Sequence, residues 1–226
     1  MIYFVAALSI CTICVVNGYP KGPPTSACSD MYPTGHKADA QTGTPYFQIT
    51  TDQATFSSGS TVTVNLIATS NYYEGVFIQA RKATTNCSSG TNDTPYGTFT
   101  IPSDDTFLQL MTCNGVTGSA VSQKTNVHIT NKTITWKAPN PVVGQVYFRG
   151  TFVKDKDTFW TDISSPVLKN ARDPSALLTV CPVRTTLKDK VPEEKVPGKN
   201  GAGRLGLPVA LVILLSTIVT VFGRVV

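Results

Sequence analysis

EGVFIQARK, residues 74–82, is the stretch that decides the predicted fold of this chain. Within it Val76, Ile78 and Ala80 occupy every second position, and the residues between them belong to the opposite side. A period of two is typical of a β-strand, because successive side chains of a strand point to opposite faces. The strand therefore has an apolar face that requires a second layer of structure to cover it.

TITWKAP, residues 133–139, is the best candidate for that second layer. Ile134 and Trp136 are two positions apart, so they share one side of another expected strand. We predict that the two stretches form the centre of two sheets packed face to face, with Trp136 in the core.

Further segments with the same alternation occur at short intervals, separated by residues that favour turns. The clearest is Thr61–Ala68, in which Val62, Val64 and Leu66 share one face. Other strands are expected at residues 44–50, 96–101, 106–112, 126–129, 145–153 and 158–160. Residues 114–124 are small and polar and are expected to form a loop. Since this region has no helical period, the predicted fold class is all-β, an antiparallel β-sandwich.

The chain has 226 residues, and the first 18 contain an apolar run that ends near Gly18. Val16 and Gly18 suit cleavage by signal peptidase, so residues 1–18 are predicted to be a signal peptide. The alternative is an N-terminal membrane anchor, but about 15 apolar residues are short for a span. We expect a secreted chain with one folded domain at residues 19–183.

The composition changes after this domain. Residues 184–203 have mixed charges and few large apolar groups, so they are predicted to form a flexible stalk. Residues 204–226 are hydrophobic and have two interpretations. The favoured one is the removable signal of a glycosylphosphatidylinositol (GPI) anchor attached at Asn200, which two small residues follow. The other is a single transmembrane helix, although such helices normally have several basic residues on the cytoplasmic side.

Four cysteines remain after the leader: Cys28, Cys87, Cys113 and Cys181. An even number in a secreted domain predicts disulfides, here two. Four cysteines allow three pairings, and their spacing does not choose among them. No two of them have the C-x-x-C spacing of a zinc or redox site, so no metal site is expected.

No combination of residues typical of an enzyme occurs in the sequence. His36 is interpreted as a hydrogen-bonded loop residue and His128 as a solvated one. Asp104 and Asp105 are expected to form a turn rather than an acid–base pair. The net charge of +5 is well spread, unlike that of a nucleic-acid-binding protein. We therefore expect no catalytic activity, no cofactor and no nucleic-acid partner.

Glycosylation and ligand contact both have candidates at the surface. The three N-glycosylation sequons are at Asn86, Asn92 and Asn131. Tyr72 and Tyr73, in a loop, and Arg81, in the central strand, are candidate ligand contacts, because aromatic and arginine side chains are common in recognition surfaces. The alternatives are burial of the tyrosines and a local carboxylate or carbonyl partner for Arg81.

Several separated motifs resemble, in their order, those of the reeler (reelin-type) domain. They are CSDMYP at 28–33 with His36, GVFIQARK at 75–82, TWKAP at 135–139 and VYFRGTFV at 146–153. The chain is most similar to the single-domain defence proteins of invertebrates. The resemblance implies an immunoglobulin-like β-sandwich with an extracellular binding role. It also implies a bridge between Cys28 and Cys113, with Cys87 and Cys181 as the second pair.

Reeler domains also occur in ferric-chelate reductase-like proteins, which add a multi-helix haem-binding core. This chain has one apolar tail without histidine, so haem-linked electron transfer is not expected. We predict a protein of innate defence, anchored at the extracellular face of the plasma membrane, that binds microbial surface polymers. The alternative is an adhesion or matrix module that binds host cell-surface glycans or proteins.

Overall fold

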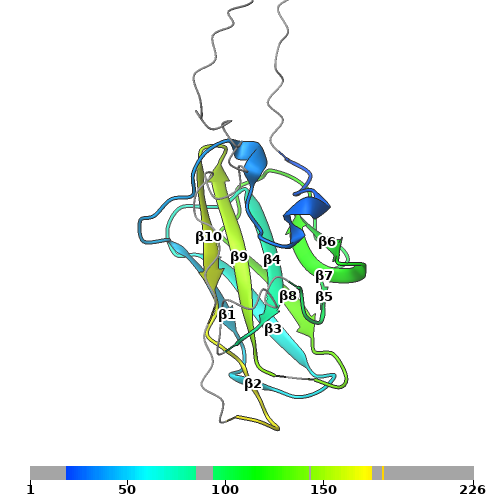
Figure 1. Ribbon diagram of the computed structural model, residues 1–226. Helices are drawn as coiled ribbons and strands as arrows, with labels where there is room; N and C mark the ends of the chain where they lie inside the picture. Colours follow the sequence, from blue (N-terminus) through cyan, green and yellow to red (C-terminus); the bar gives the residue numbers. More distant parts are fainter. Residues whose placement is uncertain (1–18, 85–93, 143, 175–179, 181–226) are drawn as a thin grey trace, which may run out of the picture. The chain divides into compact units, whose positions relative to one another are not determined.

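The computed structural model describes residues 19–84, 94–142, 144–174 and 180. Within them the chain forms eleven β-strands and two short 3-10 helices, η1 (Thr25–Cys28) and η2 (Thr34–His36) (Figure 1). The strands are β1 (Phe47–Thr51), β2 (Thr55–Phe56), β3 (Thr61–Ala68), β4 (Gly75–Lys82), β5 (Thr98–Thr100), β6 (Leu108–Cys113), β7 (Val116–Gln123), β8 (Asn131–Lys137), β9 (Val146–Asp155), β10 (Thr158–Ser164) and β11 (Lys169–Asn170).

The longer strands form two antiparallel sheets that pack face to face. One sheet has the order β1-β3-β8-β5 and the other the order β10-β9-β4-β7-β6. The short strands β2 and β11 pair in parallel as a separate ribbon. This arrangement confirms the predicted antiparallel β-sandwich. The two stretches expected at its centre, now β4 and β8, are interior strands of opposite sheets.

The main core lies between the inner faces of the two sheets. Val76, Ile78 and Ala80 of β4 belong to one apolar cluster with Ile134 and Trp136 of β8. All five are at most 1% exposed. Because burying a Val or Ile side chain stabilises a fold by about 1.5–3 kcal/mol, these contacts are a large part of what holds the sheets together.

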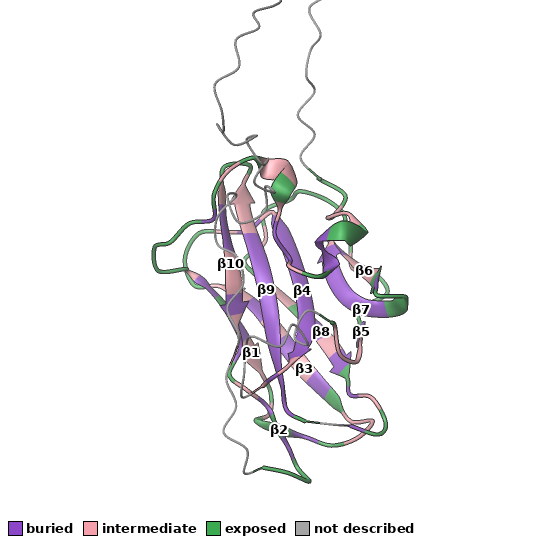
Figure 2. Ribbon diagram, in the orientation of Figure 1, coloured by how far each residue is buried: buried purple, intermediate pink, exposed green. Residues whose placement is uncertain are grey.

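Strand β4 is buried on its outer face as well, which its alternating sequence does not predict. The outer side chains Phe77, Gln79 and Arg81 are at most 4% exposed. Figure 2 shows the same burial along β4 and β9 and over much of β7. This sheet therefore has a second covering layer, which comes from the N-terminal residues described below.

Strand β7 was predicted to be a loop. Its sequence, VTGSAVSQ, has few of the branched and aromatic residues that favour strands. Small residues are needed there: a Cβ on Gly118 would lie 3.3 Å from the carbonyl oxygen of Phe99 in β5. The ladders that β7 forms with β4 and β6 outweigh its weak propensity.

Two further segments differ most from the prediction. The strand expected at residues 126–129 is wrong: in the described part of the chain this segment contributes an isolated bridge between Ile129 and Tyr73. Strand β10 continues to Ser164 through an irregularity after Trp160. Asp162, which lies in this irregularity, has a φ of 62° and forms an ion pair with Arg149 of β9.

No helix in the described ranges is long and apolar enough to cross a membrane. The predicted signal peptide (1–18), stalk (184–203) and hydrophobic segment (204–226) all lie outside these ranges. Those three assignments remain predictions.

Candidate functional site

Residues 19–36 cross the outer face of the five-stranded sheet, and we call them the N-terminal strap (Figure 1). Backbone carbonyls of such an irregular segment need hydrogen-bond partners from elsewhere when they are buried. Side chains of the sheet supply them. Gln79 Nε2 donates to the carbonyl oxygen of Cys28 at 3.0 Å, and Thr151 Oγ1 donates to that of Met31 at 2.6 Å.

Two further glutamines hold the beginning of the strap. Gln123 Nε2 donates to the carbonyl oxygen of Tyr19 at 3.2 Å, and Gln109 Nε2 donates to that of Lys21 at 2.5 Å. Gly22, with a φ of 95°, allows the close approach, because a Cβ there would lie 2.5 Å from Gln109 Nε2. The strap is therefore fixed to β6 and β7 from its first described residue.

A disulfide joins the middle of the strap to the sheet. Cys28 is bonded to Cys113 at the end of β6, and the two are 85 positions apart in sequence. Ala27, Met31 and Phe77 form a second apolar cluster around the bond. This is the bridge that the family resemblance implies.

Arg81 is a structural residue beneath the strap. It is 0% exposed, and its Nη2 donates to the carbonyl oxygens of Cys28 and Ser29 at 2.9 Å each. The interpretation of Arg81 as a ligand contact is therefore wrong, and the alternative, a local carbonyl partner, is correct. Nearby on β9, Arg149 is also buried and pairs with Asp162.

The adjacent tyrosines have opposite environments. Tyr73 is buried in the main core, where its hydroxyl donates to the carbonyl oxygen of Leu66 at 3.2 Å. Burial, together with the charge of Asp105, raises the pKa of Tyr73 well above its usual value. Tyr73 as a ligand contact is therefore wrong. Tyr72 is partly exposed and stacks on the exposed ring of His128, with 3.5 Å between ring centroids, so Tyr72 stays a candidate.

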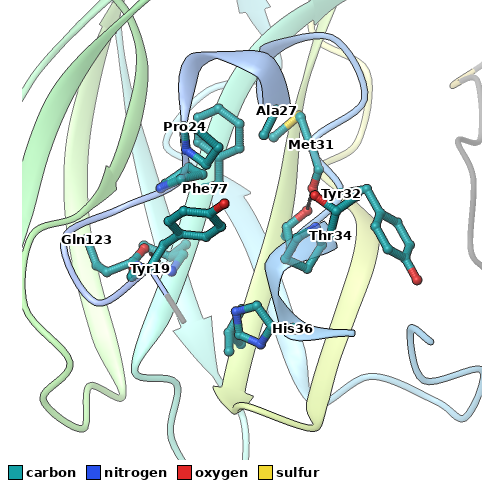
Figure 3. Close-up of a pocket in the computed structure, with 14 residues that line it drawn as sticks. Tyr19, Pro24, Ala27, Met31, Tyr32, Thr34, His36, Phe77 and Gln123 are labelled. Carbon is teal, nitrogen blue, oxygen red and sulfur yellow. Dashed lines mark hydrogen bonds between the residues drawn. The ribbon is translucent and has the colours of Figure 1, made fainter. Parts of the chain in front are cut away.

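A small apolar chamber lies between the strap and the sheet, with a volume of about 40 Å³. Pro24, Ala27, Met31, Phe77 and Val153 give it apolar walls. In Figure 3, Tyr19 and Phe77 lie to one side of the chamber and Met31 and Thr34 to the other, with His36 below them.

A wider space of about 160 Å³, the mouth, adjoins the chamber and shares four lining residues with it. The residues that line both spaces are Tyr19, His36, Gln123 and Val153. The mouth adds the carboxylate of Glu74, the amide of Asn126 and the ammonium group of Lys156. We call the chamber and the mouth together the strap groove. An apolar recess with a few polar groups at its opening is the usual form of a small-ligand site.

His36 stands where the chamber meets the mouth. Its Nδ1 lies 2.7 Å from the carbonyl oxygen of Lys156, and its ring packs edge-on against Phe159. A carbonyl oxygen accepts but does not donate, so Nδ1 carries the proton in the neutral ring and Nε2 is an acceptor. His36 is thus the hydrogen-bonded loop residue that was predicted, and it also offers an acceptor to the groove.

The pair Asp104–Asp105 forms a turn, as predicted. Asp105 accepts hydrogen bonds from the backbone N–H groups of Phe107 and Leu108, and its carboxylate lies 2.6 Å from Lys132 Nζ. Burial raises the pKa of Asp105, but the bonds from Lys132, Leu108 and Phe107 together outweigh burial and lower it. In the residues that the structure describes, no three His, Cys, Asp or Glu side chains converge as metal ligands do.

The reeler domain family model matches residues 26–176, which include most of the strap and both sheets. The chain belongs to the reeler domain family. Reeler domain proteins are typically extracellular, and the disulfide between Cys28 and Cys113 suits that environment.

Several reeler relatives have nearly the length of the region matched here. The chain is 33% identical over 172 residues to "Putative defense protein Hdd11-like" of Samia ricini. The match covers 74% of this chain and 95% of that protein. It is 35% identical to "Putative defense protein" of Bombyx mori, over 66% of this chain and 83% of that one. It is also 35% identical over 67% of its length to "Putative ferric-chelate reductase 1" of Danio rerio, but it spans only 25% of that protein.

Among solved structures, the reeler domain of human F-spondin is similar, with 21% identity and a TM-score of 0.47 over 59% of this chain and 94% of that one.

Asn131, the sequon residue within the described ranges, is exposed at the first position of β8. Predicted site residues that lie outside these ranges are Asn86, Cys87, Asn92, Cys181 and Asn200. The second bridge, the glycans at all three sequons and the lipid anchor remain predictions.

Proposed function

We propose that this reeler protein acts in innate defence at the outer face of the plasma membrane, where it recognises microbial surface polymers through the strap groove. The observation that carries the proposal is the 33% identity to a named defence protein over 95% of that protein's length. A match of that extent involves the whole architecture of the relative and not one module of a larger protein.

The groove supports a binding role because its walls are held in place before any ligand arrives. The disulfide at Cys28 and the hydrogen bonds from Gln79, Arg81 and Thr151 fix one wall, and β4 and β9 form the other. A preformed site loses less conformational entropy on binding than a flexible one does. Loss of the predicted leader and tail removes Arg204 and Arg224, so the net charge of +5 falls to +3, which adds a modest attraction to anionic microbial envelopes.

No catalytic step is assigned to this chain. The relative named as a ferric-chelate reductase is matched over 25% of its length, and that part contains the reeler domain. Its reductase name is therefore not carried over.

The binding role is tested with the full chain on the surface of cultured cells. Labelled bacteria and yeast should adhere to these cells more than to cells without the chain. Adhesion to host matrix proteins with no adhesion to microbes would overturn the defence role and favour the adhesion module.

The anchor is tested separately on the same cells. Phosphatidylinositol-specific phospholipase C should release the protein into the medium, since a GPI anchor is its only attachment in this proposal. Retention on the cells after this treatment would contradict the lipid anchor and favour a transmembrane helix.

A further inference from the structure

We propose that the strap groove binds an N-acetylated amino sugar, with the acetyl group in the chamber and the sugar hydroxyls in the mouth. This inference rests on the proposed function, because it names the chemistry by which a microbial polymer is recognised. Three features of the groove carry it: the size of the chamber, the polarity of the mouth and the groups at their junction.

The chamber is the narrower of the two spaces, with about 40 Å³ against about 160 Å³ for the mouth, so it suits the smaller part of a ligand. Its walls at Ala27, Met31 and Phe77 are apolar and suit a methyl group. A sugar hydroxyl placed against these three side chains would lose its hydrogen bonds to water without replacing them there. The chamber therefore favours an acetylated unit over a plain hexose.

The mouth has the size and polarity that the rest of such a sugar requires. Its volume of about 160 Å³ is four times that of the chamber, so it has room for the larger part of the ligand. Glu74 offers acceptors, Lys156 donors and Asn126 both. Hydroxyl groups both donate and accept, so a mixed set of this kind suits them better than it suits a ligand of one charge.

Tyr19 and His36 stand at the junction of the two spaces. Because Nδ1 of His36 faces the carbonyl oxygen of Lys156, Nε2 is the acceptor when the ring is neutral, which suits the amide N–H of an acetamido group. The Tyr19 ring packs against Gly35, since a Cβ on Gly35 would lie 2.4 Å from the ring. The backbone of Tyr19 is also held, because Gly22 N and Gln123 Nε2 both donate to its carbonyl oxygen. This ring is therefore positioned as an apolar platform for the face of a sugar.

The first experiment compares three β-1,4-linked trimers that differ in one substituent. The full chain in detergent is titrated by calorimetry with the trimers of N-acetylglucosamine, glucosamine and glucose. The acetylated trimer should bind at least about tenfold more tightly than the glucose trimer, since a small apolar group in a fitted pocket gives about that discrimination. Equal binding of the two, or no binding of the acetylated trimer, would overturn the inference.

Variants then locate the site. Ala27→Met fills the chamber and Tyr19→Ala removes the platform, so each should weaken binding of the acetylated trimer about tenfold or more. Leu110→Ala is the control, because Leu110 on β6 is as exposed as Tyr19, at 41%, but does not line the groove. If Ala27→Met lowers the thermal unfolding temperature, its weaker binding no longer reports on the chamber alone. The binding of Tyr19→Ala then decides the test. Unchanged binding by Tyr19→Ala would overturn the site.

Two sources of the same chemistry are separated by pull-down on insoluble chitin and on bacterial peptidoglycan. Retention on either polymer, lost in Tyr19→Ala, supports the inference and names the source. Microbes that adhere to the cells while no trimer selectivity exists would overturn the inference and leave the proposed function standing. Selective binding of the acetylated trimer without microbial adhesion would support the inference and overturn the proposed function.

Discussion

Arg81 lies directly beneath Cys28, and its Nη2 is 2.9 Å from the carbonyl oxygen of that cysteine. The same nitrogen is also 2.9 Å from the carbonyl oxygen of Ser29. One buried cation on β4 thus fixes the strap at the residue that the disulfide also fixes. The covering of the sheet depends on this pair of attachments, one covalent and one electrostatic.

Replacing the buried cation should loosen the strap. Arg81→Met keeps apolar bulk but leaves two carbonyls without this donor, so it should lower the free energy of unfolding by about 2–4 kcal/mol. Urea denaturation measures the loss. Arg172→Met, at an exposed position, is the matched control and should change stability by less than about 0.5 kcal/mol. Equal stability of the two variants would mean that Arg81 does not hold the strap.

Removing the disulfide should have a larger effect. The bond closes a loop of 85 positions, for which the chain-entropy account gives about 4–5 kcal/mol of stability. The double variant Cys28→Ala/Cys113→Ala should lose about that amount in urea denaturation. An unchanged unfolding midpoint, with the bond confirmed in the parent by mass spectrometry, would contradict this role.

The stability contributed by Asp105 should depend on pH. Burial raises the pKa of Asp105, but hydrogen bonds from Lys132, Leu108 and Phe107 lower it further than burial raises it. A folded pKa below the unfolded one gives stability that is present above about pH 4 and is lost as pH falls through the folded pKa. Asp105→Asn should cost about 1–3 kcal/mol at pH 7 and progressively less below pH 4. The exposed neighbour gives the control, Asp104→Asn, and a similar pH profile for both would refute the assignment.

Two glycines with nearly the same φ separate backbone strain from crowding. Gly97 has a φ of 74° and Gly115 a φ of 75°, but only at Gly97 would a Cβ meet atoms, at 2.5 Å from Trp136 Nε1 and 2.6 Å from the carbonyl oxygen of Lys137. Gly115→Ala should cost about 1–2 kcal/mol through its backbone alone. Gly97→Ala should cost about 1–3 kcal/mol more, measured by thermal unfolding. Equal losses would show that the Trp136 side is not tightly packed.

The sandwich was predictable because its inner faces follow simple alternation. Val76, Ile78 and Ala80 of β4, with Ile134 and Trp136 of β8, contain the period and the bulk that a two-layer core requires. Strand β7 was not predictable in this way, because close packing against β5 selects small residues that resemble a loop in sequence.

The site was less accessible to sequence reasoning. Arg81 and Tyr73 were suspected of facing a ligand, yet both are buried, because the strap covers one and the core encloses the other. The outer face of β4 did not announce its cover, because Phe77 shares it with the polar residues Gln79 and Arg81, as on a solvent-facing side of a strand. What a local pattern does not contain is the identity of the covering segment, which lies some fifty positions earlier.

Amide hydrogen exchange of the full chain tests the central claim, that the strap is a fixed layer of the fold and hence a preformed wall of the groove. The backbone N–H groups of Ala27 and Met31 donate to the carbonyl oxygens of Pro24 and Ala27 at 3.0 Å and 2.8 Å. Peptides that contain them should exchange nearly as slowly as those of β4. Exchange of the strap at the rate of an unstructured peptide, with β4 still protected, would contradict the account.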